Sequence, residues 1–316
     1  MNQDILTIEV GSTITKANAF RLGADERFHH LGQGFSATTV NDGDVGIGVD
    51  QVMARLQENL SRELKDPEIF INSSAAGGLR MTVHGLTHSM TARAAREAAL
   101  GAGAIIKLVT VGRLDEFDLD EIREIRPNII LLAGGVDYGE KTIVIRNAES
   151  LASLGLKIPI IYAGNAAIRK PIQKIFEIAG LNMLLADNVF PDVDVLNIDP
   201  VRHLIQEVFN QHIIHAPGMS RLGEMTDKPI LPTPGAVLRG AELFAEALGD
   251  CLVFDVGGAT TDVHSVSDGS QEWADRLTEP EPRAKRSVEG DLGVYINAQN
   301  IIDMSTHNNF EFRIDE

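Results

Sequence analysis

The sequence predicts an α/β protein, and three observations lead to that prediction. Short β-rich runs alternate with segments of helical periodicity, the arrangement that builds parallel sheets covered by helices. The 316 residues are 44% hydrophobic and 23% charged, which provides for a sizeable core. No apolar run approaches the roughly 20 residues of a transmembrane helix. At roughly 100 to 200 residues per domain, the length favours two domains or one large domain with an insertion.

The N-terminal third is expected to begin with strands. Residues 5–10 and 15–20 are β-rich runs separated by a short Gly-Ser-Thr turn, which predicts a hairpin, and residues 28–31 predict a third strand. Apolar residues recur at helical spacing over residues 49–64 and predict a helix. Residues 68–72 then predict another strand.

The middle third is expected to form a Rossmann-like layer, inserted at about residues 104–187. Strand and helix patterns alternate throughout it, as in a parallel sheet. The expected strands are residues 105–111, 128–133, 158–163 and 183–186. The expected helices are residues 118–125, 142–154 and 166–178.

The last third changes character at a proline-rich stretch. Residues 197–211 predict a helix, and residues 229–235 hold three prolines that predict a linker or hinge. A helix is expected over residues 236–248, and strands over residues 251–256 and 263–266.

The charge balance and the N-terminus narrow the expected partners and compartment. There are 28 lysines and arginines against 45 acidic residues, and the net charge of −17 repels nucleic acid and anionic lipid. Neither is therefore expected as a partner. The first residues lack the basic start and apolar run of a secretory signal. Cys251 is the single cysteine, so we expect no internal disulfide, a buried structural thiol and a cytoplasmic location.

Two glycine-containing turns carry the candidate chemistry. Each follows a strand that ends near a carboxylate, Glu9 in the first case and Asp255 in the second. Their backbone N–H groups and hydroxyls suit phosphate oxygens. Either turn alone is more typical of an ordinary hairpin, but two such turns in separate halves of a chain favour a phosphate site. The candidate phosphate-binding residues are Gly11, Ser12, Thr13, Thr15, Lys16, Gly257, Gly258, Ala259, Thr260 and Thr261.

The paired turns resemble the two phosphate motifs of the actin, hexokinase and Hsp70 ATPase superfamily. A closer resemblance is to the MutL or GlmL family, accessory proteins of adenosylcobalamin-dependent glutamate (methylaspartate) mutase. This family is unrelated to the mismatch-repair protein of the same name. The segments that carry the resemblance are residues 9–13, 72–79, 132–136, 161–165, 255–262 and 288–293.

The resemblance implies an actin-like ATPase (ribonuclease H-like) fold. Residues 1–250 would be the first lobe, which carries the insertion and the first turn, and residues 251–316 the start of a second lobe. Only 54 residues follow Asp262, and they show no glycine-rich adenosine motif, so the second lobe is expected to be incomplete.

The resemblance also implies a function. The expected cofactors are ATP or ADP with Mg²⁺, and the expected partner is a mutase subunit. The role would be that of a chaperone-like reactivating factor with slow ATPase activity coupled to partner remodelling. Asp255 would hold magnesium or position water, Glu9 would assist it, and Asp262 would be a weaker magnesium ligand. Glu9 departs from the usual aspartate of the superfamily, and Ala259 from its third glycine.

Two alternative functions stay open on the residues alone. A small-molecule kinase could use the same fold, since fold does not decide function. An actin-like filament or scaffold protein is the second alternative.

Several weaker patterns have structural interpretations. Asp262-Val-His264 resembles a cobalamin-binding motif but has Ser267 at the glycine position, so direct cobalamin ligation is not expected and His264 is taken as a strand residue. His84 and His88 lack the glutamate of a zinc site between them. Residues 134–142 miss the Walker spacing and favour a structural turn, and Asn165 favours a helix cap.

Overall fold

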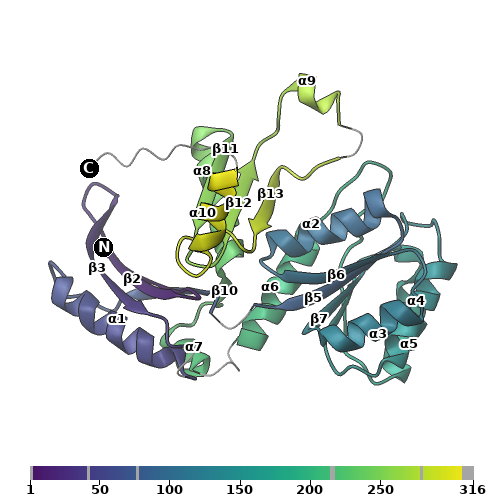
Figure 1. The fold of residues 1–316 in the computed structure, drawn as a ribbon, viewed down its shortest axis with the longest axis horizontal. Coiled ribbons are helices and arrows are strands. Elements are labelled where there is room, and N and C mark those ends of the chain that lie inside the picture. The colour runs from purple at the N-terminus through teal and green to yellow at the C-terminus, as the bar shows by residue number, and fades with distance from the viewer. Residues whose placement is uncertain (1–2, 41–42, 76–77, 214–217, 278–279, 308–316) are drawn as a thin grey trace.

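The computed structural model describes residues 3–40, 43–75, 78–213, 218–277 and 280–307. The α/β class is confirmed: these residues form three sheets, two of five strands and one of three, with helices packed against them (Figure 1). No helix among these residues is long and apolar enough to cross a membrane.

The first sheet has the strand order β10-β4-β1-β2-β3. β1 and β2 form the expected hairpin, while β4 runs parallel to β1. Alternate residues of β1 are buried, as expected for a strand with one face on the core. The elements are β1 (Asp4–Val10), β2 (Ile14–Leu22), β3 (Phe28–Ala37), α1 (Val45–Asn59), β4 (Glu68–Ser73) and β10 (Leu231–Pro232).

Helix α1 lies nearer the N-terminus than its periodicity predicts. The Asp44 side chain accepts a hydrogen bond from the Gly46 N–H and caps the helix there. Leu60 has extended backbone angles, so the helix ends before it. The apolar residues Leu60 and Leu64 continue the pattern only as loop residues that pack on the core.

The proline-rich stretch, residues 229–235, is not a linker. Leu231 and Pro232 pair with β4 as strand β10. Thr233 then begins α8 (Thr233–Leu248), with Pro234 in its first turn. A proline at that position loses no helical hydrogen bond, because the first N–H groups of a helix have no partner inside it.

The second sheet is fully parallel, with the order β6-β5-β7-β8-β9. The expected strands and helices of the middle third are present. The sheet also contains β5, which no apolar pattern predicts, so this layer begins before residue 104. Its elements are β5 (Arg80–Gly85), β6 (Ile105–Val111), α3 (Glu116–Ile125), β7 (Ile129–Leu132), α4 (Thr142–Ser153), β8 (Ile160–Tyr162), α5 (Arg169–Ile178) and β9 (Met183–Leu185).

Two short helical elements connect β5 to β6: the π-helix η2 (His88–Ala92) and α2 (Arg93–Gly101). A second connector is the 3₁₀ turn η3 (Ala166–Ile168) before α5. One buried cluster runs through β1, β5, α2 and the helix α6 (Asp199–Ile213), so the first two sheets share a core.

The third sheet has the order β11-β12-β13 and is antiparallel. It packs on α8 and α2 (Figure 1). Strand β13 was not expected from the sequence. The remaining elements are α6 (Asp199–Ile213), α7 (Met219–Met225), β11 (Cys251–Val256), β12 (Thr261–Val266), α9 (Gln271–Ala274), β13 (Ala284–Glu289) and α10 (Ala298–His307).

Candidate functional site

The two glycine-containing turns have matching hydrogen bonds. The Gly11 N–H donates to the Ile14 carbonyl at 3.0 Å, and the Gly257 N–H donates to the Thr260 carbonyl at 2.9 Å. A Cβ on Gly11 would lie 2.6 Å from the Ile14 oxygen, so no larger residue fits without a shift of the turn. Both turns are therefore tight, and they present neighbouring backbone groups at the end of a hairpin.

The fold brings these turns into contact, although Thr13 and Gly258 are 245 positions apart in the sequence. A Cβ built on Gly258 would lie 2.6 Å from the Thr13 Oγ1 and 3.1 Å from the Thr13 Cβ. Gly258 is thus needed for the close approach of the second turn to the first. Ser12 is exposed beside this contact, while Thr13 is half-buried.

Each hairpin has a carboxylate at the same position, two residues before the first glycine of its turn. Glu9 lies opposite Lys16 in the ladder, and their side chains form an ion pair of 3.3 Å. Asp255 lies opposite Asp262. Lys16 therefore offsets the charge of Glu9, whereas Asp255 has an acidic neighbour.

Asp262, which the sequence suggested as a weaker magnesium ligand, pairs with Arg286 in the structure. Its side chain is buried and accepts hydrogen bonds from the Arg286 guanidinium at 3.0 to 3.2 Å through both oxygens. Burial raises the pKa of this carboxyl, and the Arg286 charge opposes that shift. No cluster of three or more His, Cys, Asp or Glu side chains with metal-binding geometry occurs in the described ranges.

Two of the expected phosphate-binding hydroxyls are used inside the protein. Thr15 is fully buried, and its Oγ1 lies 3.0 Å from the Thr38 Oγ1. The Thr261 Oγ1 donates to the Leu292 carbonyl. Strand alternation could have placed Thr15, because it lies opposite Val10, whose side chain faces the core.

The segment after β13 holds the second turn through its carbonyl groups. The N–H groups of Tyr295 and Ile296 donate to the Gly258 carbonyl, and the Asn297 Nδ2 donates to the Ala259 carbonyl at 2.7 Å. Gly293 packs directly on Ala259, since a Cβ there would lie 2.4 Å from its carbonyl carbon. The sequence analysis did not identify Asn297 as a residue of this site. Its only indication was that residues 288–293, just before it, resemble the family motif.

The weaker patterns have the structural roles expected of them. The Glu140 carboxylate accepts from the Thr142 and Ile143 N–H groups at the start of α4. The Asn165 Oδ1 accepts from the Ala167 N–H at 2.9 Å and caps η3. His264 is a buried residue of β12.

The remaining sequence candidates lie away from the turns or outside the description. His84 is buried between Thr82 and Thr110. Cys251 is half-buried, and its Sγ donates to the Ala241 carbonyl. Ala76 and Gly77, which belong to the 72–79 segment, lie outside the described residues.

Gly258→Val tests the contact between the turns. The added side chain would overlap Thr13, and we expect the free energy of unfolding to fall by about 1–3 kcal/mol, as in an overpacked contact. Adding Thr13→Gly removes the overlapping atoms and should restore part of this loss. Denaturant unfolding of both single variants and the double variant measures the coupling.

Gly290→Val is the matched control, because a Cβ there meets no atom within 4 Å. Its effect should stay within about 0.5 kcal/mol. Additive effects of Gly258→Val and Thr13→Gly would contradict the contact.

Comparison with known proteins gives one family match and one curated relative. The family model described as "MutL protein" matches residues 5–315. Protein MutL of Clostridium tetanomorphum is 39% identical over 309 residues, which cover 95% of this chain and 66% of that protein. The chain thus spans slightly less than two thirds of this relative's length.

Two solved structures show weak similarity. The first is a nucleotide-free acetone carboxylase from work on ATP-dependent acetone carboxylation, with a TM-score of 0.42 and 14% identity. The aligned region covers 93% of this chain and 49% of the acetone carboxylase chain. The second is a glycerol dehydratase reactivase, with a TM-score of 0.19 and 12% identity. The aligned region covers 98% of this chain and 53% of the reactivase chain.

Proposed function

We propose a function on the premise that this chain belongs to the MutL protein family, as its family match establishes. The chain is a nucleotide-dependent accessory factor that reactivates an adenosylcobalamin-dependent mutase such as glutamate mutase. Its two hairpins are the phosphate-binding halves of an actin-like ATPase cleft, and the mutase subunit is its partner.

The observation that supports this proposal is the contact between Gly258 and Thr13. Two hairpins from distant parts of the chain meet at their turns, and each has a carboxylate two residues before its first glycine. Backbone N–H groups, an exposed Ser12 hydroxyl and the Lys16 ammonium are donors of the kind that phosphates require. The donor set therefore fits a Mg-nucleotide.

The residues have distinct roles in this proposal. Asp255 holds the magnesium ion or orients its water, since its neighbour Asp262 is committed to Arg286. Glu9 is oriented by Lys16 and assists Asp255. The turns would donate to the phosphates, and a magnesium ion held by Asp255 would supply positive charge next to the phosphate oxygens.

Titration calorimetry with Mg-ATP and Mg-ADP tests the nucleotide site. We would titrate this chain and a version extended to the length of the curated relative, because the adenosine side of the cleft was not visible in the sequence. Binding by the extended version supports the proposal. Binding by neither would leave the paired turns as structural hairpins.

Asp255→Asn in the extended protein tests the catalytic role. We expect ATP hydrolysis to fall by about 10²- to 10³-fold, the scale for loss of a group that stabilises developing charge. Steady-state phosphate release measures it. Asp227→Asn is the matched control, since the Asp227 side chain is 86% exposed and distant in sequence from both turns. Unchanged hydrolysis in Asp255→Asn would remove Asp255 from the mechanism.

The partner is tested with a purified mutase inactivated by damaged cobalamin. An accessory factor restores mutase activity when ATP and fresh cofactor are added. Stoichiometric phosphoryl transfer to a small acceptor would instead indicate a kinase. ATP-dependent sedimentation without mutase binding would indicate a filament protein.

A further inference from the structure

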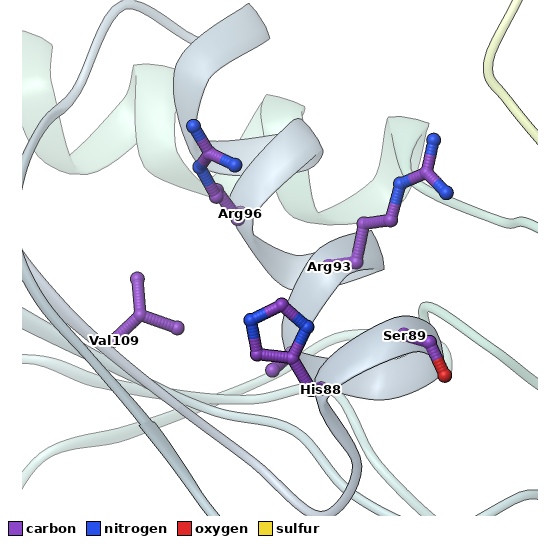
Figure 2. A pocket seen from close by; sticks show the side chains of 6 residues that line it. His88, Ser89, Arg93, Arg96 and Val109 are labelled. Carbon is purple, nitrogen blue, oxygen red and sulfur yellow. The ribbon is translucent and has the colours of Figure 1, made fainter.

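A second candidate site lies at the N-terminal end of α2. A cavity of about 430 Å³ opens there, between η2, α2 and β6. Leu100, near the other end of α2, accepts a hydrogen bond from Arg286 of β13. The 9 residues of α2 span about 13 Å, so the cavity lies about one helix length from this contact with Arg286. Its lining residues are His88, Ser89, Ala92, Arg93, Arg96 and Val109 (Figure 2).

The chain that forms one wall of this cavity is held firmly. Gly85 ends β5, and a Cβ there would lie 2.5 Å from the Ala92 backbone, so η2 folds back directly on the strand. The Thr91 hydroxyl accepts two backbone N–H groups of the same turn. His88 and Ser89 are left exposed on the outer side of this turn. π-Helical turns of this kind occur often at functional sites.

The charge of the cavity contrasts with that of the chain. Among the residues that the structure describes, no carboxylate lines it, while the whole protein has a net charge of −17. Arg93 pairs with Glu281 at 2.7 Å, which fixes one side of the rim. Arg96 is exposed and forms no ion pair among the residues that the structure describes. Figure 2 shows the two guanidinium groups directed to different sides, so Arg96 is the cation available to a ligand.

The cavity also has an apolar wall. Val109 is 37% exposed on β6, which is an edge strand of the parallel sheet, and Ala92 also lines the cavity. Its volume lies within the range of small-molecule sites, about 300 to 1,000 Å³. Ligands of open α/β sheets bind beyond the carboxyl ends of the strands, and η2 follows the carboxyl end of β5.

We propose that this cavity binds a small organic phosphate ester. The phosphate is held by the Arg96 guanidinium and the His88 ring. The organic part packs on Val109 and Ala92. Arginine suits this role because its planar group donates two parallel hydrogen bonds to a phosphate.

Calorimetric titration of the intact chain with phenyl phosphate, inorganic phosphate and benzoate tests the proposal. Phenyl phosphate should bind about 10-fold more tightly than inorganic phosphate, because its ring buries apolar surface. Benzoate should bind more weakly than phenyl phosphate. Equal affinity for benzoate would overturn the assignment of a phosphate ligand, and equal affinity for inorganic phosphate would overturn the role of the apolar wall.

Arg96→Gln should lower the phenyl phosphate affinity by about 10-fold, the scale for one charge-assisted hydrogen bond. Arg113→Gln is the matched control, an exposed arginine just after β6 that does not line the cavity, and it should bind normally. Equal losses in both variants would indicate an adventitious, charge-driven association. Loss of phenyl phosphate binding in Gly258→Val would place the anion at the paired turns and overturn the proposal. The thermal unfolding of each variant, followed by circular dichroism, checks that it is folded.

Discussion

Replacing Arg286 with methionine is expected to lower the free energy of unfolding by about 3–5 kcal/mol. The Arg286 and Asp262 side chains are only 7% and 5% exposed. Without the guanidinium, the Asp262 carboxylate is left buried without its partner, and the Leu100 carbonyl loses its hydrogen bond from Arg286. An unpaired buried carboxylate destabilises the folded state much more than the buried ion pair does, because it loses its hydration and gains no partner.

Two further variants separate this cause from general loss of packing. Asp262→Leu with Arg286→Met replaces both charges by apolar groups and should recover most of the lost stability. Arg283→Met breaks a comparable but exposed pair with Asp268, and should cost at most about 1 kcal/mol. Denaturant unfolding measures all four proteins. A double variant no more stable than Arg286→Met would show that the unpaired carboxylate is not the cause.

The Arg286 contacts also explain why β13 was missed. The six residues of β13 include Lys285, Arg286 and Glu289, a composition typical of an exposed loop. Arg286 is buried only because Asp262 on β12 and the Leu100 carbonyl on α2 receive its hydrogen bonds. Those partners are 24 and 186 residues away in the sequence, so no local pattern could indicate them.

Strand β5 was missed for a related reason. Its buried residues include Thr82 and His84, which break the apolar pattern. They are compatible with the core because His84 lies within hydrogen-bond distance of both Thr82 and Thr110. By contrast, β7 is an unbroken apolar run and β1 alternates, so both were predictable from local sequence alone.

In the candidate site, too, the local features could be predicted from the sequence, whereas the contacts between distant segments could not. The tight geometry of each turn follows from local residues, since the N–H groups of Gly11 and Gly257 each donate to the carbonyl three residues further along the chain. The contact of Gly258 with Thr13 depends on how two sheets pack, so no local sequence pattern indicates it. The pairing of Asp262 with Arg286 has no local sequence signal, because Arg286 lies on β13, a strand that the sequence did not predict.

Acidification should destabilise the protein strongly through His84. Burial lowers the pKa of its imidazole from 6.5 to about 3. The folded state therefore keeps the ring neutral, while the unfolded chain takes up a proton below about pH 6.5. The stability due to the neutral ring is complete above pH 6.5, declines as the pH falls toward 3, and changes no further below that. At about 1.36 kcal/mol per unit, the full effect is about 5 kcal/mol.

The loss can be isolated with His84→Gln, which keeps a donor and an acceptor toward Thr82 and Thr110 but does not titrate. Between pH 7 and 4.5, the wild type should lose about 3 kcal/mol more stability than this variant. His203→Gln, at an exposed position of α6, should follow the wild type throughout. A wild type and His84→Gln that lose stability in parallel would mean that the folded protein admits a proton at His84, as it would if the ring became exposed.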